Sequence, residues 1–411
     1  MKYAFRFLSF VILSFLFICN ISYSEELPPL VEKNVENKFP VTILKLTAKN
    51  FESRIIPAEA RTRMTEGGED DLDIFKEPLW IEGKLNPLYK KWYSSKLHNL
   101  IQYINLYAGR NLFLIMPTTT ADNLSQGTDR IRVGGNFSTV FMRETEGQFD
   151  AQFDYEVLEG YVIFNYGLTD DIEAGIYARG FHYSAGRMDS FKNTFEKAVT
   201  GSDGGRGKFP NNQYAQTLTV DGKKVFDAKK NEFQAGDLIT TLKFKVLEET
   251  PASPAVAILT AVKLPTGDED AGFGSGTLDG GVSFVFTKHF TKQLRAHLNL
   301  GVAQPGGNGS FPETTTVYSF IPAIEYAFNT RWQAAFQVNL STSPFDNIPF
   351  AGIGESSFNI GVALTRNMDS GNQWHLYFMD ELDNSGDPDY VVGWAYDVWP
   401  LLGKKAIKKT D

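Results

Sequence analysis

The sequence of 411 residues contains a single cysteine, Cys19, and only five histidines. Cys19 precedes the cleavage site expected below, so we expect neither a disulfide nor a thiolate metal site in the mature chain. Charged residues make up only 22% of the chain and aromatic residues 14%, which excludes an intrinsically disordered protein. The net charge of −9 argues against a nucleic-acid partner, because binding to phosphates requires an excess of cations.

Long apolar runs are also missing. Beyond the N-terminus there is no stretch of about 18 apolar residues, the length that a membrane-spanning helix needs. The mean hydropathy is −0.23. These features exclude a helical membrane protein but leave a membrane β-barrel open, because barrel strands alternate apolar and polar residues and so average to a neutral hydropathy.

The N-terminus has the organisation of a secretory signal peptide. Lys2 and Arg6 precede an apolar run over Phe7–Ile18, and Ser22-Tyr-Ser24 supplies small residues for signal peptidase. We predict that residues 1–24 are removed, which changes the net charge to −11 because two cations leave with them. The alternative is a retained membrane anchor, for which the run is short.

Residues 25–107 form an N-terminal extension with a different pattern. An acidic segment over 66–73 is followed by Asn86-Pro87, a typical helix start. Leu97, Leu100, Ile101 and Ile104 then recur at helical spacing up to Gly109, which predicts a helix. The extension has two interpretations, a plug or periplasmic contact element of a barrel, and a small packed extension.

From about Thr128 the apolar residues alternate with polar ones. In Trp332–Leu340 one face is Trp, Ala, Phe, Val and Leu, and the other is Gln, Ala, Gln and Asn. Leu294–Val302 and Phe358–Thr365 divide in the same way. Because side chains alternate across a strand, each segment predicts a strand with one apolar face and one polar or small face.

This period predicts about twelve strands, each long enough to cross a bilayer at a tilt. They lie near 131–143, 156–168, 172–184, 236–248, 255–264, 279–288, 293–303, 315–328, 331–343, 355–366, 372–382 and 389–399. Short connections alternate with long ones rich in Gly, Pro, Asn and Asp, as in outer-membrane barrels. Aromatic residues also cluster at strand ends, as in Tyr326, Phe328 and Trp332, where a membrane barrel has its aromatic girdles.

We therefore predict an all-β fold, a transmembrane antiparallel β-barrel of about 12 strands over residues 108–399 with a partly helical N-terminal extension and a basic tail over 400–411. The alternative is a soluble β-sandwich, which would bury the apolar face of each strand between two sheets. An even number of strands would place both ends of the barrel on the periplasmic side.

Several short motifs, in a fixed order, carry a resemblance to a known family. They are Arg110-Asn-Leu-Phe113, Tyr166-Gly-Leu-Thr-Asp170, Met188-Asp-Ser-Phe191, Gly236-Asp-Leu238, Val262-Lys-Leu-Pro-Thr-Gly-Asp268 and Gly274-Ser-Gly-Thr-Leu-Asp279. From about Arg110 to Trp399 the chain resembles a Gram-negative family known only as a domain of unknown function and taken to be an outer-membrane barrel. The Leu-Pro-Thr-Gly and Gly-Ser-Gly pair also resembles outer-membrane barrels for uptake of aromatic compounds and fatty acids. Twelve residues follow Trp399, whereas many such barrels end on an aromatic residue.

The glycine-rich part of this motif is expected to form a loop. Pro265-Thr266-Gly267 ends a strand because proline cannot donate to the ladder, and Gly272, Gly274 and Gly276 then allow a tight return before Asp279. No helix follows that would favour phosphate binding. The neighbouring acidic residues 268–270 have the oxygen ligands of a Ca²⁺ site, but we interpret them as a solvated loop and predict no metal.

The polar faces of the strands carry the candidate lumen residues. They are Lys243, Lys245, Lys263, Arg295, His297, Glu325, His375 and Asp397, with Glu173 on a neighbouring strand. One hypothesis is a basic wall opposed by acidic groups, whose field orients a solute. The other is that these charges simply pair, because an unpaired buried charge is costly.

We expect a passive channel or transporter for a small solute, without a cofactor, that contacts outer-membrane lipid and the barrel assembly machinery. A non-conducting structural or surface-interaction barrel is the second hypothesis. An outer-membrane enzyme is the third, with His182 beside Ser184 as its strongest pair, although no third group that would orient the histidine is visible.

Overall fold

The computed structural model describes residues 78–87, 89–90, 100–107, 109–185, 210–230, 233–307, 313–345, 348–368, 370–381, 388 and 390–399. The expected signal peptide, the acidic segment over 66–73, the basic tail and the Met188–Phe191 motif lie outside these ranges. Among the described residues, no helix is long and apolar enough to cross a bilayer.

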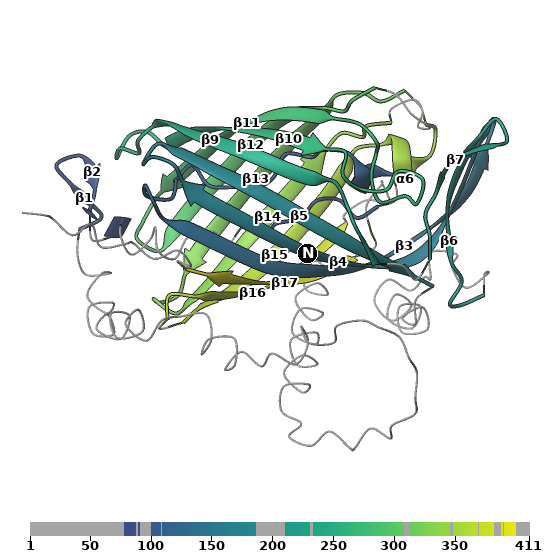
Figure 1. Ribbon diagram of the computed structural model, residues 1–411. Helices are drawn as coiled ribbons and strands as arrows, with labels where there is room; N and C mark the ends of the chain where they lie inside the picture. The colour runs from purple at the N-terminus through teal and green to yellow at the C-terminus, as the bar shows by residue number, and fades with distance from the viewer. Residues whose placement is uncertain are drawn as a thin grey trace, which may run out of the picture. The chain divides into compact units, whose positions relative to one another are not determined.

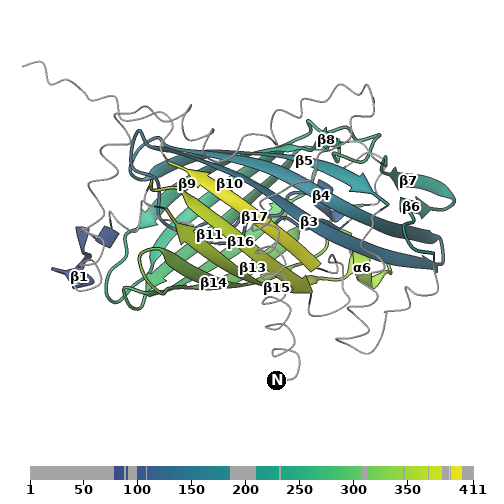
Figure 2. The same ribbon diagram turned by 90° about the horizontal axis from the view of Figure 1, so that it is seen from below.

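Twelve antiparallel strands close into a barrel, as predicted (Figure 1). Each strand pairs with the next along the chain, and the last pairs with the first through Val398 and Ile131. Figure 2 shows this closure, with β17 beside β3 and β3 beside β4. The strands are β3 (Asp129–Glu146), β4 (Phe149–Gly167), β5 (Ile172–Ser184), β9 (Leu238–Leu247), β10 (Ala255–Leu264), β11 (Asp279–His289), β12 (Leu294–Gln304), β13 (Val317–Ala327), β14 (Trp332–Ser341), β15 (Ser357–Asn367), β16 (Gln373–Glu381) and β17 (Tyr390–Val398).

The apolar face of the strands points outward. On β12, Leu300 and Val302 are exposed, whereas Asn299 and Gly301 are buried inside the barrel. Large apolar side chains are exposed all around the outer wall, among them Leu158, Phe284, Ile324, Phe336 and Trp394. The sandwich alternative is therefore wrong, since a sandwich would bury these side chains and expose the polar ones.

The two rims of the barrel differ in the way that the sequence predicts. At one rim, which we call the short-turn rim, tight turns connect β4 to β5, β9 to β10, β11 to β12, β13 to β14 and β15 to β16. The barrel begins at Asp129 and ends at Val398 at this same rim. The opposite long-loop rim carries the connections after β5, β10, β12 and β14, and the short helix α6 (Ala351–Gly354).

The first hairpin extends beyond the barrel at the long-loop rim. The sequence prediction ended its first strand at 143 and began the second at 156, which is wrong, because β3 and β4 pair without interruption up to Glu146 and Phe149. The extension is supported by a second hairpin, β6 (Ala215–Val220) and β7 (Lys223–Asp227), since β6 pairs with residues 149–154 of β4 (Figure 1). A short strand, β8 (Phe233–Ala235), pairs with β5.

The described part of the N-terminal extension contains a small hairpin, β1 (Trp80–Ile81) and β2 (Lys84–Leu85). A helical turn follows, in which the Lys90 N–H donates to Asn86 O at 2.8 Å. The helix predicted up to Gly109 is wrong for residues 101–106, which are not helical. Their backbone groups find partners inside the barrel instead, as described next. A 3₁₀ turn, η3 (Arg110–Leu112), follows.

Candidate functional site: the lumen and the segment inside it

Residues 100–107 and 109–128, which we call the lumen segment, run through the interior of the barrel. The side-chain amides of Gln337 and Asn299 on the wall each bind both the N–H and the carbonyl oxygen of one residue of this segment. The Ile101 N–H donates to Gln337 Oε1 at 3.0 Å, and Gln337 Nε2 donates back to Ile101 O at 3.1 Å. Asn299 binds Thr119 in the same way, at 3.0 Å in each direction. An amide has both a donor and an acceptor, so it replaces a strand partner.

Charged and hydroxyl side chains of the wall continue this pattern. The Leu114 N–H donates to Asp279 Oδ2 at 2.8 Å and the Leu124 N–H to Glu173 Oε2 at 2.9 Å. Lys243 Nζ donates to the carbonyl of Asp122 at 2.6 Å. These bonds satisfy backbone groups that would otherwise be costly to bury. The lumen segment is therefore held mainly by side chains of the barrel wall.

Two inward-facing glycines make room for the lumen segment. A Cβ atom on Gly301 would lie 2.9 Å from Met116 Cβ and 2.4 Å from Ser319 Oγ, and one on Gly281 would lie 2.4 Å from Met116 Sδ and 2.9 Å from Val302 O. Real Cβ atoms do not approach other atoms so closely, so a side chain at either position would push against both Met116 and the neighbouring wall. The small residues on these polar faces are thus explained by the segment that lies against them.

At the long-loop rim the lumen segment packs into an apolar cluster. Its Leu106, Tyr107 and Phe113 are buried against residues of β3, β4, the β6–β7 hairpin and the loop that carries α6. Tyr155 Oη also donates to Leu106 O at 3.1 Å. The long-loop end of the barrel is therefore filled by a hydrophobic core.

The charged candidates from the sequence lie inside the barrel and are paired. Arg295 Nη2 lies 2.7 Å from Glu325 Oε2, and Lys243 Nζ lies 3.4 Å from Glu173 Oε2. Lys263 Nζ lies 2.6 Å from an oxygen of Asp237. These distances favour the pairing hypothesis over a basic wall facing an acidic one, since cations and anions alternate around the lumen.

Lys245 differs from the other candidates because it lies at the short-turn rim. Its Nζ is 2.8 Å from Glu248 Oε1 and 3.9 Å from Asp171 Oδ1, both in turns. Lys245 therefore fastens two neighbouring turns instead of lining the central part of the lumen.

The two lumen histidines make equivalent contacts, each with one threonine and one carboxylate. His297 contacts Thr287 Oγ1 through Nδ1 at 3.0 Å and Glu325 through Nε2 at 3.1 Å. His375 contacts Thr365 at 2.8 Å and Asp397 at 3.1 Å. These groups resemble a nucleophile, base and acid, but both threonines are fully buried, so no substrate reaches them in this structure.

The other catalytic candidate lies on the wrong side of the wall. His182 and Ser184 share the outward parity of Ile176 on β5, whereas Tyr183 faces inward and is buried. His182 and Ser184 therefore do not line the lumen.

Sequence reasoning missed several charged lumen residues, among them Arg132, Arg179 and Glu159. Arg132 binds Asp397 through Nε at 2.6 Å and Nη2 at 2.7 Å, and Arg179 Nε lies 2.6 Å from Glu159 Oε1. The alternation along β3, β4 and β5 places them all on the inward faces. The signal was therefore the same period that identified the strands.

The sequence model of a family described as "Protein of unknown function (DUF3187)" matches residues 99–398. The chain belongs to the DUF3187 family. The predicted resemblance to an outer-membrane barrel family of unknown function is confirmed, but its expected start near Arg110 is too late. The match begins at 99, so this DUF3187 chain includes the lumen segment in the part that defines the family.

Solved structures with a similar fold are outer-membrane proteins of low sequence identity. The COG4313 outer membrane channel from Pseudomonas putida F1 is 15% identical, with 68% of this chain and 97% of that chain covered and a TM-score of 0.46. The toluene transporter TbuX from Ralstonia pickettii is 9% identical, with 67% and 90% covered and a TM-score of 0.32. The NanC porin is 10% identical, with 66% and 97% covered and a TM-score of 0.37. No curated protein matches the chain.

The family motif of this DUF3187 chain is organised around Asp237. Its carboxylate accepts from the Gly267 N–H at 2.9 Å, the Ser275 N–H at 3.1 Å and Lys263 Nζ at 2.6 Å. A Cβ on Gly274 would lie 2.7 Å from Asp237 Oδ1, so glycine is required for this approach.

The rest of the motif ties the loop to its surroundings. Pro265 follows the end of β10, and Thr266 Oγ1 accepts from the Leu238 N–H at 2.9 Å. Gly276 has a φ of 69°. Asp279 accepts from the Gly306 N–H as well as from Leu114 of the lumen segment. The motif therefore fastens the loop after β10 to the segment inside the barrel.

At the short-turn rim, Glu249 and Tyr89 connect the extension to the turns. Glu249 accepts from the His289 N–H at 2.7 Å and lies 2.6 Å from His289 Nδ1 and 3.0 Å from Lys288 Nζ. Burial alone would raise the pKa of Glu249, but its hydrogen bonds to His289 and Lys288 outweigh burial and lower the pKa. Tyr89 donates to Lys292 O at 2.7 Å, and burial raises the pKa of Tyr89 to about 12.

Glu249 predicts a pH dependence of stability. Its pKa is lower in the folded state, so its contribution is present above the unfolded value of about 4.3 and is lost as the pH falls through the folded value. Glu249→Gln should lower stability at pH 7 by about 1–3 kcal/mol and reduce the loss between pH 5 and pH 3. Thermal unfolding in detergent at these pH values checks this. The exposed Glu82→Gln is the control, and equal acid sensitivity of Glu249→Gln and the wild type would contradict the assignment.

Proposed function

We propose that this protein is an outer-membrane channel or transporter that passes a small solute when the lumen segment moves aside. We also propose that residues 1–24 direct export, that the barrel assembly machinery inserts the chain, and that the apolar outer face contacts lipid. The short-turn rim then faces the periplasm, because short turns lie on that side in outer-membrane barrels.

One observation carries this proposal. The lumen is lined by polar side chains, and several of them hold a separate segment through one or two hydrogen bonds each. Water or a solute can take over such bonds at little net cost, because the exchange replaces one hydrogen bond with another. Barrels of eight strands are filled by their own side chains and those of sixteen or more are open, so twelve strands leave room for a segment that regulates passage.

The experiment must distinguish a channel from a non-conducting barrel. Gly301→Val places carbon atoms where Met116 lies and should push the lumen segment away from the wall. We expect liposomes with this variant to swell faster in small sugars and amino acids than liposomes with the wild type. Gly160→Val is the matched control, because a Cβ at Gly160 meets nothing within 4 Å. Equal and negligible swelling of all three proteins, each folded, would favour a structural barrel.

A further inference from the structure

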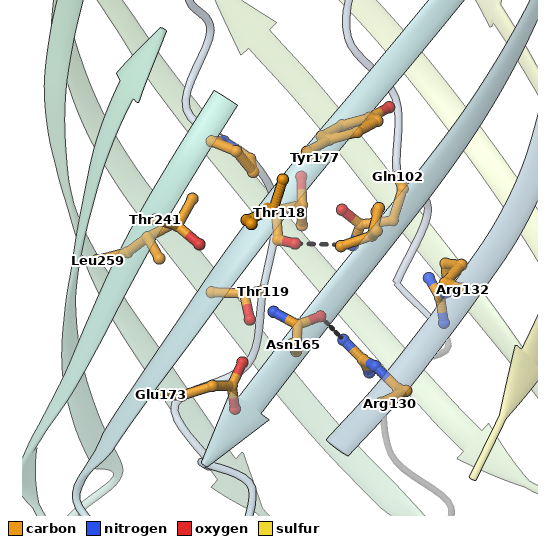
Figure 3. A pocket seen from close by; sticks show the side chains of 13 residues that line it. Gln102, Thr118, Thr119, Arg130, Arg132, Asn165, Glu173, Tyr177, Thr241 and Leu259 are labelled. Carbon is orange, nitrogen blue, oxygen red and sulfur yellow. Dashed lines mark hydrogen bonds between the residues drawn. The ribbon is translucent and has the colours of Figure 1, made fainter. Parts of the chain in front are cut away.

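A small cavity of about 40 Å³ lies between the barrel wall and the lumen segment, near the short-turn rim. Figure 3 shows that side chains from the wall, including Arg130 and Asn165, and from the lumen segment, including Thr118, surround it. A space of this size holds more than one water molecule, so it has room for a small polar ligand. Ile163 and Leu259 give it apolar sides.

Arg130 is the unusual residue of this cavity. Its side chain is buried, Nη2 donates to Asn165 Oδ1 at 2.8 Å, and the guanidinium lies 5.7 Å from the centre of the Trp399 ring. Nε and Nη1 are buried without a hydrogen-bond partner among the described residues. A guanidinium has five donors and is always charged, so leaving two of its nitrogens unsatisfied in a buried place is costly.

No carboxylate of the described wall is available to neutralise Arg130. Asp397 is held by Arg132, and Glu173 is held by Lys243 and the Leu124 N–H. By contrast, five other buried cations of the described lumen each have a carboxylate within 4.0 Å, namely Arg132, Arg179, Lys243, Lys263 and Arg295. Arg130 is therefore a buried cation of this cavity that forms no ion pair with a carboxylate among the described residues.

We propose that this cavity binds a small monocarboxylate, with Arg130 holding the carboxylate. A carboxylate neutralises the charge of the guanidinium, and its oxygens can accept from the unpartnered Nε or Nη1, which lie on different edges of the group. Thr118 Oγ1, which is buried without a partner among the described residues, supplies a further donor. The apolar sides suit the carbon end of the ligand. This inference deepens the proposed function by naming a solute class, but binding itself does not require conduction.

The test uses the full chain folded in detergent, with sodium acetate and sodium formate as probes. We expect both salts to raise the midpoint of thermal unfolding in a saturable way above equal concentrations of sodium chloride or of neutral acetamide. Arg130→Gln should weaken acetate binding about tenfold or more, as expected for loss of a charged hydrogen-bond partner. Arg366→Gln, which removes an exposed arginine of β15, should leave binding unchanged.

Three results would overturn the proposal. They are an acetate shift no larger than that of chloride, an acetate shift no larger than that of acetamide, and full retention of the shift in Arg130→Gln. If Arg130→Gln does not fold, the comparison of acetate with chloride and acetamide on the wild type decides alone. Acetate binding together with absent swelling would reject the channel and keep the site, so the two failures are distinguishable.

Discussion

Replacing Asp397 with asparagine should lower the free energy of unfolding by about 3–5 kcal/mol. Asp397 is fully buried and accepts two hydrogen bonds from Arg132, at 2.6 and 2.7 Å. The substitution leaves the Arg132 guanidinium buried without its anion, which is the costly way to break a buried pair. Urea unfolding in detergent micelles measures the change.

Two further variants make this result interpretable. Asp171→Asn removes an exposed carboxylate 3.9 Å from Lys245, and we expect it to cost at most about 1 kcal/mol. The double variant Arg132→Met with Asp397→Leu removes both charges and should recover most of the loss, because a well-packed apolar pair often replaces a buried ion pair without cost. Wild-type stability of Asp397→Asn would mean that water, rather than protein, surrounds this pair.

We expect the wild-type channel to open rarely or not at all, and the variant that lacks residues 100–128 to show a steady conductance. Without the segment, the inward faces of the strands carry side chains that are polar or small, such as Asn299, Gly301 and Gln337, and water can fill the space. Planar-bilayer recordings measure the conductance. The variant should also unfold at a lower temperature, because it loses the apolar cluster at the long-loop rim.

Heat-modifiable gel mobility shows whether the deletion variant still forms a barrel. A folded variant with no more conductance than the wild type would contradict the role of the lumen segment as the element that closes the barrel.

The strands could be read from the sequence because membrane barrels obey a local rule. Each strand carries its own period of two, as in β12 and β14, so neither alignment nor tertiary information is required. The same rule placed Lys243, Lys263, Arg295 and Asp397 inside the barrel. It also marks Arg130 and Arg132 on β3, which the sequence analysis did not use.

The lumen segment could not be predicted because its partners are distant in the sequence. Ile101 binds Gln337, which is 236 positions away in the sequence. The residues around Ile101 carry no local pattern that predicts an extended conformation. The apolar residues of this segment instead recur at the spacing that is typical of a helix. The β6–β7 hairpin, by contrast, has a local signal. Asp221-Gly222, both with positive φ, forms the two-residue turn that joins its strands.

The most direct test of the account is to lock the lumen segment to the wall. Met116→Cys with Gly301→Cys places two Cβ atoms about 2.9 Å apart before relaxation, and a disulfide needs only slightly more, about 3.5–4.5 Å. The only native cysteine, Cys19, lies in the expected signal peptide. We predict no conductance in the oxidised protein and, after reduction in the same bilayer, openings at least as frequent as those of the wild type, because a side chain at position 301 pushes the segment away from the wall. Identical conductance before and after reduction would contradict a lumen that opens by displacement of this segment.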